Sequence, residues 1–162
     1  MTLRDYEIFE LGDVPLQSGL TLRNAQLAYK TYGRLDASRG NAIVYPTSYG
    51  AQHYDTEWLI RSGQALDPER YFIIIPNMFG NGLSSSPSNV GPPHDRGRFP
   101  GVTVTDNVRM QRRHASCEQG VFLPGSVTRN AEIENFDPGC KSRTRAKIAL
   151  DHGSQRVFLR QV

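Results

Sequence analysis

Alternating apolar and polar positions mark two strands near the start of the chain. Residues 6–11 (YEIFEL) and 25–32 (AQLAYKTY) alternate in this way, which is typical of half-buried strands. Turn-forming residues separate the two runs at Gly12-Asp13 and Gln17-Ser18-Gly19, and Gly33 ends the second run. We therefore expect the opening strands to form a hairpin or a meander.

Two later runs are apolar without alternation. They are residues 41–45 (NAIVY) and 71–75 (YFIII), which Pro46 and Pro76 follow directly. Continuous apolar runs of this length are typical of strands covered on both faces, as in a parallel sheet. We expect both runs to be buried strands.

Two segments carry helix-start signals. Residues 56–62 (TEWLIRS) predict a short helix that Thr56 caps and Gly63 ends. Residues 102–110 (VTVTDNVRM) predict the entry to a second helix, which Thr105 caps. The order strand, helix, strand, loop, helix is that of an α/β protein.

A long loop separates the last strand from the second helix. Residues 79–101 contain five glycines and four prolines in 23 positions, and such loops are usually functional or disordered. We expect the three serines within it, Ser84, Ser85 and Ser86, to be solvated, since a nucleophile would need a base nearby. Residues 80–82 (GNG) lack the lysine and following helix of a phosphate-binding loop, which favours a structural turn.

The chain changes character near Gln111. Residues 1–110 carry 10 basic and 11 acidic residues, whereas residues 111–162 carry 9 and 5, within a net charge of +3. Residues 112–147 show no sustained period of 2 or 3.6. We therefore divide the chain into an ordered part, 1–111, and an irregular basic tail, 112–162.

Composition excludes several classes of protein. No stretch approaches the roughly 20 apolar residues that a bilayer span needs, so we expect no membrane partner. Charges within residues 1–9 argue against a signal peptide, and two cysteines cannot form a disulfide framework. A reducing compartment, by default the cytoplasm, is the expected location.

The tail offers little support for a metal or nucleic-acid site. Its possible zinc ligands are His114, Cys117, Cys140 and His152. The spacing from Cys140 to His152 is too wide for a usual zinc finger, so we predict free thiols and no metal site. The basic runs 112–113 and 141–147 lack the interleaved aromatic residues of a nucleic-acid surface, so no nucleic-acid partner is expected.

Six segments in order carry a resemblance to a known family. They are residues 16–19 (LQSG), 28–33 (AYKTYG), 65–67 (ALD) with 70–72 (RYF), 76–82 (PNMFGNG), 99–100 (FP) and 104–111 (VTDNVRMQ). Together they resemble the N-terminal region of homoserine O-acetyltransferase-like α/β-hydrolases. Relatives of this group also occur in fungal secondary-metabolite and toxin clusters. The resemblance covers residues 5–111.

The resemblance implies the N-terminal part of an α/β-hydrolase fold, with a mostly parallel sheet, and serine-dependent acyl transfer or hydrolysis. In this chemistry a serine attacks an ester or thioester, a histidine takes its proton, and an aspartate orients the histidine. The implied substrates are a small-molecule ester, acyl-CoA or an alcohol, with no metal or prosthetic group. A role in secondary-metabolite or toxin biosynthesis and a homo-oligomeric parent family are implied in the same way. A peroxisomal location is the alternative by pathway, although residues 160–162 (RQV) are not an S-K-L type signal.

The family's nucleophile elbow, G-x-S-x-G on a strand-to-helix turn, is absent from this sequence. The nearest match, residues 82–86 (GLSSS), lacks the second glycine, so no catalytic residue is assigned. The family's aspartate and histidine are expected beyond Val162. Two interpretations stay open: a protein related to the acyltransferases and hydrolases but without its own elbow, and a non-catalytic truncated copy or interaction fragment. A shifted reading frame or a mis-spliced exon after Gln111 would explain the tail, although residues 146–159 are faintly similar to a family segment that follows the nucleophile strand.

One part of the family's site falls on residues that this chain has. In α/β-hydrolases the loop after the third strand donates a backbone N–H to the oxyanion. By position that loop is residues 46–50, with Ser48 or Tyr49 as donor, and the alternative is a plain strand-ending turn. His53 and Asn77 are candidates to line the site; the alternatives are a polar surface residue for His53 and turn support for Asn77.

Overall fold

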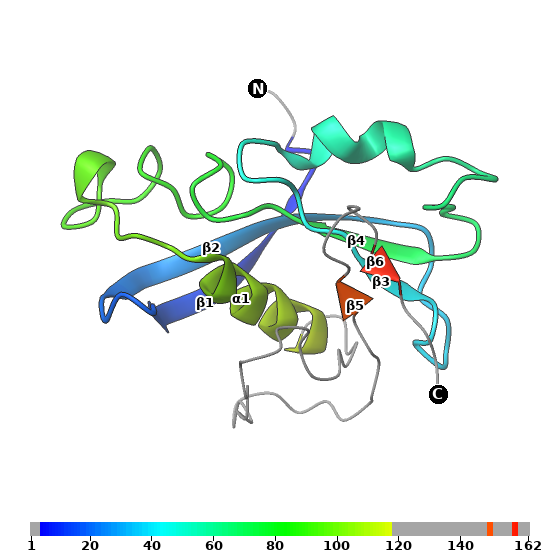
Figure 1. Cartoon of the computed structure of the whole chain (residues 1–162), viewed down its shortest axis with the longest axis horizontal. Helices are drawn as coiled ribbons and strands as arrows, with labels where there is room; N and C mark the ends of the chain where they lie inside the picture. The colour runs from blue at the N-terminus through cyan, green and yellow to red at the C-terminus, as the bar shows by residue number, and fades with distance from the viewer. Residues whose placement is uncertain (1–3, 118–148, 151–156, 159–162) are drawn as a thin grey trace.

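A four-stranded sheet forms the centre of the protein (Figure 1). The computed structural model describes residues 4–117, 149–150 and 157–158. In spatial order the strands are β1 (Glu7–Pro15), β2 (Thr21–Tyr32), β4 (Phe72–Pro76) and β3 (Ala42–Val44). A separate pair, β5 (Ala149–Leu150) and β6 (Val157–Phe158), is antiparallel.

Strand direction follows from the length of the connections. β1 and β2 pair antiparallel across a short turn, as the predicted hairpin requires, and β2 also pairs antiparallel with β4. The turn predicted at Gly12-Asp13 is wrong: both residues lie inside β1, where shifts in the pairing register accommodate them. β3 and β4 pair parallel, because the long connection between them contains a helix and allows a crossover. The expectation of a mostly parallel sheet therefore applies to the β3–β4 pair, while the other two pairings of the described sheet are antiparallel.

Both faces of the sheet are covered, which explains the continuous apolar run in β4. Ile74 packs with Tyr29, Val44 and Ala115 on the face that helix α1 (Val104–Cys117) covers. Ile73 and Ile75 pack on the opposite face with Leu66, Leu59 and neighbouring residues, below the 3₁₀ helix η1 (His53–Leu59). Figure 1 shows the two helices on opposite sides of the sheet. The prediction of two buried strands is confirmed.

Helix η1 begins earlier than the sequence predicts. It starts at His53, and the Asp55 carboxylate accepts a hydrogen bond from the Gln52 backbone N–H at 2.8 Å. Thr56 is not the cap: it lies inside the helix, where its hydroxyl donates to the His53 carbonyl at 2.7 Å. The helix ends at Leu59, before Gly63.

Helix α1 begins with Thr103 as its cap, so the prediction of Thr105 is wrong. The Thr103 hydroxyl accepts from the Asp106 N–H at 3.1 Å, and the Asp106 carboxylate accepts from the Thr103 N–H at 2.9 Å. This reciprocal pair satisfies two N–H groups that the helix start leaves free. The helix runs past Gln111 to Cys117, with His114 and Ala115 buried. It therefore crosses the boundary predicted at Gln111, and that boundary stays a prediction.

The three loop serines are buried, so the prediction that they are solvated is wrong. Ser84, Ser85 and Ser86 are 0%, 3% and 1% exposed. The Ser84 hydroxyl accepts from the Ala28 N–H at 2.9 Å, and the Ser85 hydroxyl accepts from the Gln26 N–H at 2.8 Å. Their burial has a physical cause, since strand β2 extends beyond β4 and its buried backbone groups need partners.

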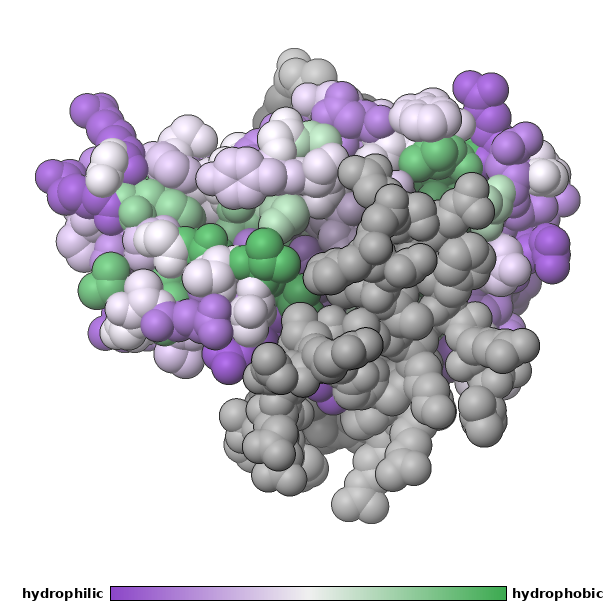
Figure 2. Space-filling model, in the orientation of Figure 1, coloured by the Kyte–Doolittle hydropathy of each residue, from purple (hydrophilic) through white to green (hydrophobic). Residues whose placement is uncertain are grey.

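No helix among the described residues combines the length and the apolar character that a bilayer span requires. On the face seen in Figure 2, apolar side chains form separate patches among polar ones. Scattered apolar residues of this kind are ordinary on a protein surface.

Replacing Ser84 with alanine tests the role of the serine loop. We expect Ser84→Ala to lower the free energy of unfolding by about 1–3 kcal/mol, because the buried Ala28 N–H loses its acceptor. Urea unfolding followed by circular dichroism measures the change. The control is Ser88→Ala, at an exposed serine of the same loop, which should leave the unfolding midpoint in place. Equal effects of the two substitutions would contradict the role.

His114 lies in the core between α1 and the sheet. Its side chain is 0% exposed, and its ring centroid lies 4.0 Å from that of Tyr29 and 5.2 Å from that of Phe9. Burial lowers the pKa of His114 from 6.5 to about 4. Between these values the unfolded chain binds a proton at this residue and the folded protein does not.

Acidification should therefore destabilise the protein through His114. As pH falls from 6.5 to 4, we expect its contribution to lower the free energy of unfolding by about 3 kcal/mol. His114→Phe keeps an aromatic ring in the site and should remove this part of the pH dependence. Urea titrations at several pH values measure both slopes. Identical slopes for the two proteins would refute the assignment.

Candidate functional site

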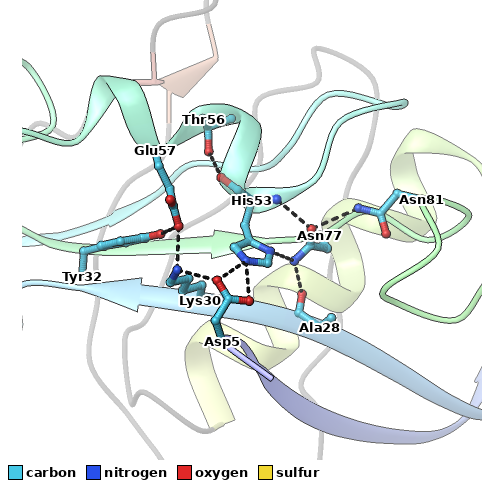
Figure 3. A network of polar contacts seen from close by, with 9 residues as sticks. All are labelled: Asp5, Ala28, Lys30, Tyr32, His53, Thr56, Glu57, Asn77 and Asn81. Carbon is cyan, nitrogen blue, oxygen red and sulfur yellow. Dashed lines mark hydrogen bonds and ion pairs between the residues drawn. The ribbon is translucent and has the colours of Figure 1, made fainter. Parts of the chain in front are cut away.

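Buried His53 is the centre of a polar network between η1, β2 and the loop after β4 (Figure 3). The Asn77 side-chain oxygen accepts from the His53 backbone N–H at 3.0 Å. The Asn77 side-chain nitrogen lies 3.4 Å from His53 Nδ1, and His53 Nε2 lies 3.3 Å from the Asp5 carboxylate. Because an amide nitrogen only donates, these contacts assign the ring proton to Nε2.

The surface alternative for His53 is wrong, since its side chain is 1% exposed. Both ring nitrogens are engaged, Nδ1 as an acceptor and Nε2 as a donor. The ring therefore holds the N-terminal segment against the loop after β4. Asn77 is fully buried, and its hydrogen bonds agree with the turn support that was its alternative. Whether either residue lines a substrate site stays a prediction.

An ionic cluster adjoins His53. The Lys30 ammonium donates to Glu57 at 2.6 Å and to Asp5 at 2.9 Å, and the Tyr32 hydroxyl donates to Glu57 at 2.6 Å. Burial opposes the charge on Lys30, but the hydrogen bonds from its ammonium to Glu57 and Asp5 raise its pKa above the ordinary value. The hydrogen bonds from Lys30 and Tyr32 lower the pKa of Glu57. The cluster therefore stays charged at neutral pH.

The same side chains can be compared with a metal site. Asp5, His53 and Glu57 each offer a possible ligand atom, and these atoms lie within 4.8 Å of one another. The Lys30 ammonium contacts both carboxylates and already supplies a positive charge there. We assign the cluster a structural role. Of the four possible zinc ligands named from the sequence, His114 is in the core, Cys117 is the last residue of α1, and Cys140 and His152 lie outside the described residues.

The predicted oxyanion loop lies at the carboxyl end of β3. Thr47 anchors it, because its N–H donates to the Pro76 carbonyl at 3.2 Å and its hydroxyl accepts from the Met78 N–H at 3.2 Å. The Ala51 N–H donates to the Ser48 carbonyl at 3.1 Å and closes the turn. Tyr49 is 78% exposed. Within residues 4–117, the backbone N–H groups of Ser48 and Tyr49 donate to no other group.

The glycine-rich turn after β4 uses its own N–H groups. The Gly80 N–H donates to the Ser85 carbonyl at 3.0 Å, and the Gly82 N–H donates to the Ser86 hydroxyl at 2.8 Å. Both glycines have positive φ, +88° and +95°, which a residue with a side chain rarely adopts. These N–H groups are therefore engaged within the turn, in agreement with the structural turn predicted there.

Sequence reasoning missed the ionic cluster. Lys30 and Tyr32 lie two residues apart on one strand, so alternation places them on the same face. That pattern was visible, but their partners Asp5 and Glu57 come from segments distant in the chain. Only the packing of η1 and the N-terminal segment against β2 brings the four together.

Comparison with known proteins found close relatives but no matching family model. The chain is 39% identical over 107 residues to an ethyl acetate hydrolase from Pseudomonas veronii, covering 65% of this chain and 31% of that protein. It is 35% identical over 150 residues to a homoserine O-succinyltransferase from Bordetella pertussis, covering 80% and 36%. Among solved structures, the acetyl esterase MekB matches with a TM-score of 0.70 and 37% identity, covering 72% of this chain and 34% of that one.

The extent of these matches has two consequences. The chain spans about a third of the length of the curated relatives it matches. The match to the B. pertussis protein covers 80% of the chain, which is more than residues 1–117 provide. Relatedness therefore continues beyond Cys117, into the part predicted as an irregular tail.

A fluorophosphonate probe tests whether a described serine is a nucleophile. Among residues 4–117, no serine hydroxyl hydrogen-bonds a histidine, and Ser84 and Ser86 donate to backbone carbonyls at 2.7 and 2.6 Å. We therefore expect no labelled peptide from residues 4–117 above a heat-denatured control, by mass spectrometry. Selective labelling of any of Ser84, Ser85 or Ser86 would contradict this interpretation.

Proposed function

Because its relatives are homoserine O-acyltransferases and esterases of the α/β-hydrolase superfamily, whose N-terminal region it matches, we propose a function in serine-dependent ester chemistry. In this proposal, residues 4–117 provide the oxyanion-binding loop for hydrolysis or transfer of a small acyl group. The observation that carries the proposal is the pair of free backbone N–H groups, at Ser48 and Tyr49, on an anchored loop at the carboxyl end of β3.

The chemistry needs these donors when charge develops on the substrate. A serine oxygen adds to the ester carbonyl, a base takes the serine proton, and the carbonyl oxygen becomes an oxyanion. The Ser48 and Tyr49 N–H groups would donate to this oxyanion. Collapse of the adduct expels the alcohol, and water or a second alcohol then accepts the acyl group. Donors already held in place stabilise the transition state without reorganising.

In this proposal the described residues supply the oxyanion loop and not the nucleophile. The sequence has no G-x-S-x-G elbow, and the buried serines support the fold. The serine would therefore come from outside residues 4–117. A non-catalytic truncated copy or an interaction fragment is the alternative, and a full chain that neither hydrolyses p-nitrophenyl acetate nor reacts with a fluorophosphonate would favour it.

Finer aspects of the function rest on the family resemblance. We propose a small ester, acyl-CoA or alcohol as substrate, with no metal or prosthetic group. Secondary-metabolite or toxin biosynthesis, a cytoplasmic or peroxisomal location and a homo-oligomeric state stay predictions.

Substitution of Tyr49 in a chimera tests the oxyanion loop. Residues 1–111 would be joined to the part of the P. veronii ethyl acetate hydrolase that follows the matched region. We expect the chimera to hydrolyse p-nitrophenyl acetate. Tyr49→Pro removes the backbone N–H and should lower kcat by about 100-fold or more.

Tyr49→Ala is the matched control, because it removes the side chain and keeps the N–H. Its kcat should stay within about threefold of the parent chimera, since the donor is retained. The pair Ser48→Pro and Ser48→Ala repeats the comparison at the other donor. If proline and alanine have equal effects at both positions in a folded, active chimera, the oxyanion role is wrong.

A further inference from the structure

We infer that Asn81, together with Asn77 and Gln52, is a positioning residue that holds the Ser48–Gly50 loop. This inference rests on the proposed oxyanion role of that loop. The three side-chain amides are called the amide clamp below. They join the segment after β3 to the segment after β4, across 24 to 30 positions of sequence.

The outer part of the clamp connects Asn81 with the end of the loop. The Asn81 side-chain nitrogen donates to the Ala51 carbonyl at 3.1 Å, and the Gln52 side-chain nitrogen donates to the Asn81 carbonyl at 2.8 Å. Ala51 in turn donates its N–H to the Ser48 carbonyl. The clamp therefore acts on the residue that closes the turn carrying the two free N–H groups.

The inner part of the clamp connects the loop to the sheet. The Asn77 oxygen accepts from Asn81 at 3.1 Å and from the His53 N–H, and its nitrogen donates to the Ala28 carbonyl of β2 at 3.2 Å. Figure 3 shows the Asn77 and Asn81 amides turned toward each other beside His53. Asn77 is fully buried, and its hydrogen bonds fix the position of the loop relative to strand β2.

An exposed loop needs such support to serve as an oxyanion site. Residues 48–50 are exposed and have little packing of their own. Thr47 holds the start of the loop to Pro76 and Met78, and the clamp holds its end. Donors fixed at both ends lose little conformational entropy when the oxyanion forms.

Asn81 has a second role that a substitution can separate from the clamp. Its side-chain oxygen accepts from the Leu83 N–H at 3.1 Å and from the Ser84 N–H at 3.4 Å. Asn81→Asp keeps this acceptor and loses the donor to both Ala51 and Asn77. Gln52→Ala removes the other hydrogen bond of the outer clamp, the one from Gln52 to the Asn81 carbonyl. Gln52 itself lies outside the turn that the Asn81 side chain supports.

Backbone order parameters of the full chain test the clamp by ¹⁵N relaxation. In the unsubstituted protein we expect values of about 0.85 at Ser48, Tyr49 and Gly50, as for rigid backbone. Asn81→Asp and Gln52→Ala should each lower these values toward about 0.6, while Leu83 and Ser84 change little. A residue that only supports its own turn would affect Leu83 and Ser84 and not the loop.

Asn89→Ala is the matched control. Its side-chain nitrogen donates to the Ser84 carbonyl at 3.0 Å and to the Gly82 carbonyl at 3.2 Å, so it perturbs the glycine turn without touching the clamp. The inference is overturned if residues 48–50 are already mobile in the unsubstituted protein, or stay rigid in both clamp variants. If the clamp variants loosen the loop but Tyr49→Pro and Tyr49→Ala act alike in the chimera, the oxyanion proposal fails and the clamp stands.

Discussion

Strand β2 imposes the constraint on which the described structure depends, because each of its buried backbone groups needs a partner. β1 pairs with one edge of β2 along most of its length. β4 pairs with the other edge only from Tyr29 to Tyr32. The segment after β4 that contains Ser84 and Ser85 continues along that edge. Its hydroxyl and backbone groups hydrogen-bond the backbone of Gln26 and Ala28. A buried N–H without an acceptor costs about 1–3 kcal/mol, so this loop has to be ordered.

The same constraint brings the candidate site together. Completing β2 draws the segment after β4 across the carboxyl ends of β3 and β4, where Asn77 and Asn81 meet the segment that contains Ala51 and His53. The loop with the free N–H groups is therefore tied to hydrogen bonds that also stabilise the sheet. Fold and site share the same residues in this region, and loss of the glycine turn would affect both.

On the other side of Asn77, charged side chains and His53 hold the N-terminal segment and η1 in place, and none of them is a reactive group. Lys30 is paired with two carboxylates, and both nitrogens of His53 are engaged. A histidine held on both sides orients the N-terminal segment and η1. It does not have the free nitrogen that a general base needs. The described residues are thus consistent with the oxyanion loop proposed above, to which a nucleophile from elsewhere would be added.

The sequence alone determined that four strands are present and which family the chain resembles, but not that β1 continues through Gly12-Asp13. Alternation in residues 6–11 and 25–32 and the apolar runs at 41–45 and 71–75 report burial directly, since a strand's side chains point to alternate faces. Six ordered motifs identified the relationship that the relatives bear out. Helix limits were less well predicted, because Thr103 and Thr105 are equally good caps by residue type and only their surroundings distinguish them.

Tertiary structure decided the roles of the polar residues. Ser84 to Ser86 have the composition of a solvated loop, and His53 that of a surface residue, yet all four are buried. Their burial depends on partners that lie far away in the chain, such as Ala28 for Ser84 and Asn77 for His53. Local patterns carry no information about such pairings, because a polar side chain is stable in water or against a matching partner. Only the folded chain shows which of the two environments it has.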